Sequence, residues 1–179
     1  MKEIEVKVLE INKKSVSEKI SAHGGVQIFD GSISTTFLDY SDNSIHLRKD
    51  VLRLRKEKDS AELTYKKVHF DKTVKVAEET SVQISSFDDA LLILQNLGLT
   101  VKDKMEKYRT SFKLHEVKID IDNYYGDYAY IPEFLELEGP EKAIGEVATL
   151  LGFQEKDCRP WSTDELIKYY GAKEKKGRV

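Results

Sequence analysis

Charged residues recur at every second position in four short segments of this chain. The segments are Glu3-Ile4-Glu5-Val6-Lys7, Leu52-Arg53-Leu54-Arg55, Ile119-Asp120-Ile121-Asp122 and Leu135-Glu136-Leu137-Glu138. In an extended strand, residues two apart point to the same face, so each segment has a charged face and an aliphatic face. Carboxylates suit Mg²⁺ or Mn²⁺, and arginine and lysine suit phosphate oxygens. The chemistry that this set favours is the binding of a metal-bound polyphosphate.

Each segment taken alone is typical of a half-solvated antiparallel sheet, whose charged face looks at water. Two helical stripes argue against that description of the whole: Phe87, Ala90, Leu91, Leu94 and Leu97, and then Ala143, Ile144, Val147, Ala148 and Leu151. These stripes have helical spacing and need an apolar surface to cover. The aliphatic face of the strands is the surface of matching size. The pattern therefore predicts helices outside a curved sheet, whose charged face lines a channel if the sheet closes.

The candidate lining has both signs of charge. Its members are Glu3, Glu5, Glu79, Asp122, Glu136 and Glu138, with Lys7, Arg53, Arg55, Lys66, Lys107 and Arg109. Such a lining requires local ion pairs or a bound ligand with its ions. The ten glycines form neither a P-loop nor a Gly-x-Gly-x-x-Gly turn. Any bound phosphate is therefore expected to be held by side chains.

Five motifs in sequence order resemble those of the CYTH family. They are Glu3-x-Glu5-x-Lys7, Val51-Leu52-Arg53-Leu54-Arg55-Lys56, Leu63-Thr64-Tyr65-Lys66, Lys107-Tyr108-Arg109 and Ile131-Pro132-Glu133-Phe134-Leu135-Glu136-Leu137-Glu138-Gly139. The family comprises class IV adenylyl cyclases, thiamine triphosphatases and inorganic triphosphatases, also called triphosphate tunnel metalloenzymes. The resemblance spans about residues 1 to 170. The first motif is weak alone, whereas five motifs in family order are specific.

This resemblance implies an α+β fold in which an eight-stranded antiparallel β-barrel forms a triphosphate tunnel with helices packed on the outside. It places Glu3, Glu5, Asp122, Glu136 and Glu138 at Mg²⁺ or Mn²⁺, and Lys7, Arg53, Arg55, Lys66, Lys107 and Arg109 at the triphosphate, with Glu5 and Lys7 as catalytic residues. Glu79 and Asp120 are further candidates. The chain departs from the family pattern at Ala77, where a basic residue is usual, and in the long segment Asn123 to Tyr130.

Two reactions fit such a site. An adenylyl cyclase would convert ATP into cyclic AMP and pyrophosphate, and the motif set most resembles chains grouped with the class IV cyclases. A triphosphatase would release phosphate from inorganic or thiamine triphosphate, and its chemistry suits the same residues. A module that binds polyphosphate or a nucleotide without catalysis is a third reading, which the full set of carboxylates disfavours.

Composition excludes several other classes. A net charge of -3 over 179 residues gives no case for nucleic acid or an anionic membrane. The single cysteine, Cys158, excludes an internal disulfide framework, and the N-terminus has no apolar signal region, so a cytoplasmic location is the default expectation. We expect one domain over residues 1–171 and a polar tail over 172–179. Homodimerisation stays open.

Two further segments have local signals. Ser162 to Glu165 reads as a capping box that starts a helix through Tyr170, which Gly171 would end. Val16, Ile20 and Ala22 give an earlier helix its apolar side. The tyrosine-rich loop Tyr124 to Tyr130 suits packing on the barrel rim better than the alternative role, which is stacking on a base or thiazole.

Overall fold

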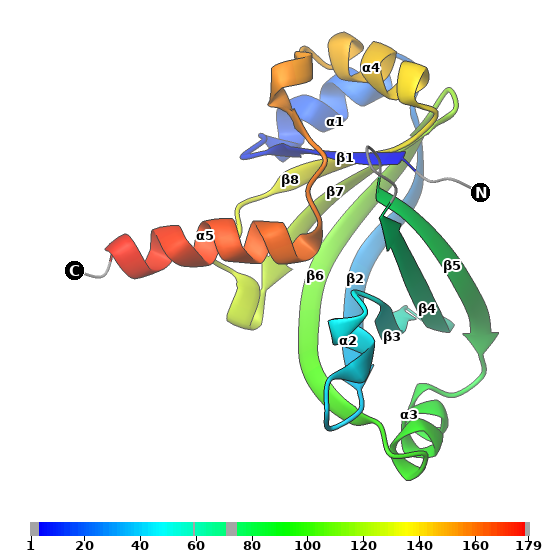
Figure 1. The fold of residues 1–179 in the computed structure, drawn as a ribbon. Coiled ribbons are helices and arrows are strands. Elements are labelled where there is room, and N and C mark those ends of the chain that lie inside the picture. Colours follow the sequence, from blue (N-terminus) through cyan, green and yellow to red (C-terminus); the bar gives the residue numbers. More distant parts are fainter. Residues whose placement is uncertain (1–3, 59, 71–74, 178–179) are drawn as a thin grey trace. The chain divides into compact units, whose positions relative to one another are not determined.

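The computed structural model describes residues 4–58, 60–70 and 75–177. The protein has an α+β fold with a nine-stranded antiparallel sheet (Figure 1). The strands are β1 (Ile4–Leu9), β2 (Val26–Asp39), β3 (Val51–Glu57), β4 (Ser60–Phe70), β5 (Lys75–Ile84), β6 (Thr100–Leu114), β7 (Val117–Tyr125), β8 (Phe134–Gly139) and β9 (Cys158–Arg159). Their order is β5-β4-β3-β2-β6-β7-β8-β1-β9.

This strand order corrects the prediction of a closed eight-stranded barrel. The order has two ends, so the sheet is open as far as the described residues extend, and it has a ninth strand. The extra strand is short: Cys158 pairs with Val8 and Arg159 pairs with Lys7. Since β8 already occupies the other edge of β1, this stretch of β1 has neighbours on both edges and is not available to close a barrel.

The helices are α1 (Lys13–Ala22), α2 (Ser44–Leu47), α3 (Phe87–Asn96), α4 (Glu141–Leu150) and α5 (Thr163–Gly177), with short 3-10 turns η1 (Gly126–Tyr128) and η2 (Glu155–Asp157). The chain divides into two compact units. Unit 1 contains Ser32–Glu106, and unit 2 contains Glu3–Gly31 with Lys107–Val179. Within the described parts of the chain, no helix is long and apolar enough to cross a membrane.

In unit 2, α1 and α4 cover the aliphatic face of β1, β8 and β7. Ile20 of α1 and Val147 of α4 are buried in one cluster with Leu135 and Leu137 of β8. Figure 1 shows the two helices beside each other on one side of these strands, with α5 on the other side. The predicted apolar side of α1 is confirmed for Val16 and Ile20, whereas Ala22 is exposed. Helices α1 and α4 therefore pack on the face opposite the charges, as the stripe of α4 predicted.

In unit 1, α3 performs the same role. Ser86 caps the helix by accepting a hydrogen bond from the Asp89 amide at 3.2 Å. Phe87, Leu91 and Leu94 then pack against the cluster that contains buried Leu54 of β3. The predicted stripe is thus confirmed as a core contact for Phe87, Ala90, Leu91 and Leu94, whereas Leu97 is 65% exposed.

Helix α5 begins as predicted and ends later. The Ser162 amide donates to Glu165 at 2.7 Å, and the Glu165 amide donates to the Ser162 hydroxyl at 3.3 Å, which confirms the capping box. The predicted stop at Gly171 is wrong, because α5 continues to Gly177. Tyr170 donates to Glu10 at 3.0 Å and Lys173 donates to the same carboxylate at 3.3 Å. These contacts hold the helix on both sides of Gly171. Residues 178 and 179 of the predicted tail lie outside the described residues.

Candidate active site

Strands β1, β8, β7 and β6 bring opposite charges together on one face of unit 2. We call this set the unit 2 charge cluster: Glu5, Lys7, Lys107, Arg109, Lys118, Asp120, Asp122, Glu136 and Glu138. The pairing register places Glu5 opposite Glu138, and Lys7 opposite Glu136. On the other edge of β8, Asp120 lies opposite Glu136. Because directly paired residues point to the same face, the predicted period-two charges of three strands become neighbours.

Lys7 is the most buried cation of the cluster. Its side chain is 1% exposed, and Nζ lies 2.9 Å from Glu5 Oε1 and 2.9 Å from Glu136 Oε2. Burial by itself would lower the pKa of Lys7, but the carboxylates of Glu136 and Glu5 outweigh burial and raise that pKa above its ordinary value. Lys7 is therefore positively charged and is paired with both carboxylates in this structure.

Asp122 holds the two cations of β6. Lys107 Nζ donates to Asp122 Oδ2 at 2.7 Å, and Arg109 donates to both carboxylate oxygens at 2.6 Å. Burial opposes ionisation of this carboxyl, yet Lys107 and Arg109 lower the pKa of Asp122 below its ordinary value. Arg109 also reaches Glu136 at 3.7 Å. Burial raises the pKa of Glu136, but Lys7 and Arg109 outweigh it and hold that pKa well below its usual range.

Lys118 is a site residue that the sequence analysis did not include. Its ammonium lies 3.0 Å from Asp120 Oδ2 and 3.8 Å from Glu138 Oε2. It stands two positions before Asp120, so the same period-two alternation could have identified it. Asp120 itself is 2% exposed, and its Oδ1 atom is buried with no hydrogen-bond partner among the described residues. That oxygen is a free acceptor within the cluster.

Unit 1 has a second set of charges, which we call the unit 1 charge cluster: Arg53, Arg55, Lys66 and Glu79. Lys66 pairs with Glu79 across β4 and β5, and their charged atoms are 2.7 Å apart. Arg53 lies 3.8 Å from the same carboxylate. Burial opposes ionisation of Glu79, but Lys66 and Arg53 lower its pKa below the ordinary value. Arg55 lies 3.6 Å from Glu57, and its Nε atom is buried without a hydrogen-bond partner among the described residues.

The predicted site residues are thus gathered within each unit, apart from Glu3, which lies outside the described residues. Strand alternation was sufficient to select most of them. It could not supply the partners, since Lys7 and Glu136 are brought together by pairing of the first strand with the eighth.

The donor set of unit 2 fits a small divalent cation that is also held by phosphate. Glu5 and Glu138 are paired carboxylates whose side chains are 39% and 30% exposed. Mg²⁺ commonly binds through one or two carboxylates together with substrate phosphates. No larger ligand set has formed in the part of the chain that the structure describes, because Lys7, Lys118 and Arg109 separate the acids. Both Asp122 oxygens already accept hydrogen bonds, so its assignment to metal stays a prediction.

The tyrosine-rich loop is largely packed on itself. Tyr124 is 6% exposed and stacks on Phe134 with ring centroids 6.0 Å apart. Tyr128 lies 6.3 Å from Tyr124 and 6.2 Å from Tyr130. The Tyr124 ring also lies 5.5 Å from Lys107 Nζ. These contacts favour the packing role over stacking on a ligand.

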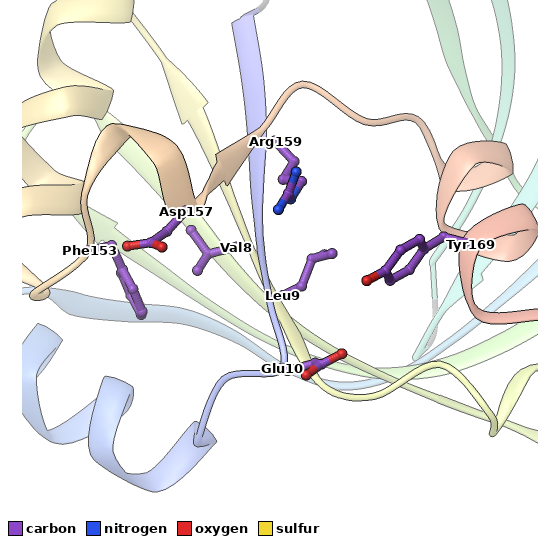
Figure 2. A pocket seen from close by; sticks show the side chains of 7 residues that line it. All are labelled: Val8, Leu9, Glu10, Phe153, Asp157, Arg159 and Tyr169. Carbon is purple, nitrogen blue, oxygen red and sulfur yellow. The ribbon is translucent and has the colours of Figure 1, made fainter. Parts of the chain in front are cut away.

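A pocket of about 390 Å³ lies within unit 2, between the end of β1, the segment from Phe153 to Arg159, and α5. Figure 2 shows Leu9, Arg159 and Tyr169 on one side of β1, and Val8, Phe153 and Asp157 on the other. The members of the unit 2 charge cluster do not line this pocket. Lys7 is nevertheless a direct neighbour, because it pairs with Arg159.

Comparison with known proteins agrees with this geometry. Residues 1–155 match the CYTH domain. A Methanocaldococcus jannaschii protein named "Putative adenylate cyclase" is 28% identical over 147 residues, which are 82% of this chain and 80% of that protein. A Pyrococcus horikoshii OT3 structure has a TM-score of 0.75 at 24% identity, over 92% of this chain and 98% of the other. A Hippeastrum structure, described as a "Putative adenylyl cyclase" with dominant triphosphatase activity, has a TM-score of 0.63 at 13% identity, over 96% and 88%. The chain belongs to the CYTH family, whose members are enzymes that act on triphosphates.

Proposed function

We propose that this protein is a divalent-metal-dependent enzyme that acts on a triphosphate, with adenylyl cyclase activity as its first function. The observation that carries the proposal is the unit 2 charge cluster, where Lys7, Lys107 and Arg109 are buried together with carboxylates on one sheet face. Three buried cations side by side suit successive phosphate groups. The name of the Methanocaldococcus jannaschii relative supports a cyclase.

The balance of charge in the cluster explains why a metal would be needed. The cluster as defined has one more carboxylate than it has cations, so it does not attract a polyanion by itself. We propose that Glu5, Glu136 and Glu138 hold Mg²⁺ or Mn²⁺, together with Asp122 and the undescribed Glu3. When bound, such an ion neutralises phosphate charge and polarises the phosphorus that is attacked.

In the proposed cyclase reaction, the ribose 3′ oxygen forms a bond to the α phosphorus. The bond from that phosphorus to the oxygen of the β phosphate breaks, and pyrophosphate leaves. Lys7 donates to the phosphoryl oxygens where negative charge gathers, and Glu5, released from Lys7, accepts the proton of the 3′ hydroxyl. Lys107 and Arg109 hold the remaining phosphates. Arg53, Arg55 and Lys66 are proposed as further phosphate-binding residues, and Glu79 keeps Arg53 and Lys66 in place.

Triphosphate hydrolysis is the second candidate, and the Hippeastrum relative with dominant triphosphatase activity favours it. Here water attacks the terminal phosphorus, and the bond to the neighbouring phosphate breaks. The same cations would hold the chain of phosphates, with inorganic or thiamine triphosphate as alternative substrates. The two reactions differ in the nucleophile, which is the ribose 3′ oxygen or water, and in which phosphorus is placed before it.

Product analysis by phosphorus NMR tests these proposals. The full chain is incubated in turn with ATP, thiamine triphosphate and inorganic triphosphate, each with Mg²⁺ or Mn²⁺. Cyclic AMP with pyrophosphate would support the cyclase. Orthophosphate without a cyclic product would identify a triphosphatase. If no substrate turns over with either metal, the catalytic proposal fails and a binding module becomes the better description.

A further inference from the structure

We propose that the pocket at the end of β1 binds the base and ribose of a nucleoside triphosphate whose phosphates lie on the unit 2 charge cluster. The inference rests on the proposed function, because it takes Lys7 as a phosphate-binding residue. It names the substrate class, and it assigns Arg159 and Tyr169 roles that no motif of the sequence predicted.

Arg159 extends the charged face by one strand. It pairs with Lys7 across β9 and β1, and directly paired residues point to the same face of a sheet. The guanidinium lies 5.2 Å from the Trp161 ring, which holds it beside α5. Lys7 lies between two carboxylates. Arg159, in contrast, forms no ion pair with a carboxylate of the described residues. A ligand that extends from Lys7 along this row therefore meets Arg159 as the next cation.

Tyr169 forms the wall beyond Arg159. Its ring is 41% exposed and is held by Trp161 at 5.1 Å and by Tyr170 at 4.9 Å between centroids. Lys173 lies over the ring at 4.4 Å and is hydrogen-bonded to the Tyr169 side chain, which leaves the ring edge for a ligand. Figure 2 shows the hydroxyl of Tyr169 directed toward Leu9, with Arg159 and Glu10 nearby. The aromatic edge of Tyr169, the aliphatic side chain of Leu9 and the polar groups of Arg159 and Glu10 thus line the same pocket.

The size and chemistry of this space select among triphosphates. The whole pocket, whose lining lies on both sides of β1, has a volume of about 390 Å³, which is within the usual range for small-molecule pockets. Adenine has an amino donor and ring-nitrogen acceptors, which match the Glu10 carboxylate and the guanidinium donors of Arg159. Inorganic triphosphate has no group to fill the pocket. The pocket therefore fits a nucleoside such as adenosine.

Trp161, the only tryptophan of the chain, provides a direct test. Its fluorescence is followed during titration of the full chain with ATP, AMP and inorganic triphosphate, with free tryptophan as the control for absorption by adenine. We expect ATP and AMP to change the emission and inorganic triphosphate to leave it unchanged. Equal responses to ATP and inorganic triphosphate, or no response to ATP, would contradict the pocket.

Variants of Tyr169 and Arg159 give the second readout. Tyr169→Ala should raise KM for ATP about tenfold, since loss of an aromatic contact of about 1.4 kcal/mol is a factor of ten. KM for inorganic triphosphate should stay within twofold, and Tyr169→Phe should retain most ATP affinity. Arg159→Gln should show the same selectivity. Equal loss for both substrates would indicate a structural role for these residues and overturn the proposal.

The two proposals can fail separately. If the protein turns over no triphosphate, yet ATP alone changes Trp161 emission, the catalytic proposal is wrong and the nucleoside pocket stands. If the protein hydrolyses or cyclises its substrate and Tyr169→Ala leaves KM for ATP unchanged, the pocket is wrong and the catalytic proposal stands.

Discussion

Replacing Asp122 with asparagine should destabilise the protein strongly. Asp122 is completely buried and accepts hydrogen bonds from Lys107 and Arg109 at 2.6 to 2.7 Å. Asparagine keeps the shape but removes the charge and directs an amide donor toward two cations. Breaking a buried ion pair costs about 3–5 kcal/mol. Arg109 retains Asp120 and Glu136 as partners, so we expect about 3 kcal/mol, the lower end of that range.

Urea unfolding of Asp122→Asn, followed by circular dichroism and Trp161 fluorescence, measures this loss. With a slope of about 2 kcal/mol per molar urea, the midpoint should fall by about 1.5 M. The matched control is Asp127→Asn, an exposed aspartate in η1, which should change stability by less than about 0.5 kcal/mol. A loss below about 1 kcal/mol in Asp122→Asn, or one equal to the control, would refute the buried ion cluster.

Three other predictions test the charge clusters. Glu5→Gln should abolish turnover and leave the circular dichroism spectrum unchanged, whereas exposed Glu18→Gln on α1 should keep full activity; retained metal-dependent turnover in Glu5→Gln would remove Glu5 from the metal site. Arg55→Ala should weaken the binding of inorganic triphosphate, measured by calorimetry, more than that of orthophosphate, because its buried Nε is available as a donor; equal losses would contradict a grip on several phosphates. The pKa of Glu136 is lower in the folded protein than its unfolded value of 4.5, so its contribution to the free energy of unfolding is complete above pH 4.5 and is lost as pH falls below it. Urea unfolding between pH 7 and pH 3 should show this decline, and Glu136→Gln should reduce it; an unchanged slope would contradict the pairing with Lys7.

The sequence predicted the faces of the strands well, because alternation is a local property. Alternation assigned Glu5 and Lys7 to one face, and helical spacing assigned Phe87, Ala90, Leu91 and Leu94 to the core. It could not predict that Glu136 lies opposite Lys7, since that contact joins residues far apart in sequence. The two-residue strand β9 was too short to have a pattern of its own.

The later end of α5 has a similar cause. Gly171 is a reasonable local stop signal, but Tyr170 and Lys173 are both hydrogen-bonded to Glu10, which is distant in sequence. Long-range contacts of this kind override local propensity. The pocket could not be predicted from local patterns either, because Leu9, Arg159 and Tyr169 come from three separate elements.

The alternating charges of unit 2 also favour one alignment of its strands over others. The aliphatic face of β1 would fit β8 equally well after a shift of two residues, because apolar residues recur at that interval. The charged face of β1 would fit β8 less well after such a shift. In one shifted pairing Lys7 would lie opposite Phe134. In the other, Lys7 would lie opposite Glu138, but Glu136 would lie opposite Leu9 and lose its contact with Lys7. Each error would bury a charge against an apolar side chain. The residues proposed for catalysis therefore also select one alignment of the strands among several that hydrophobic packing alone would permit.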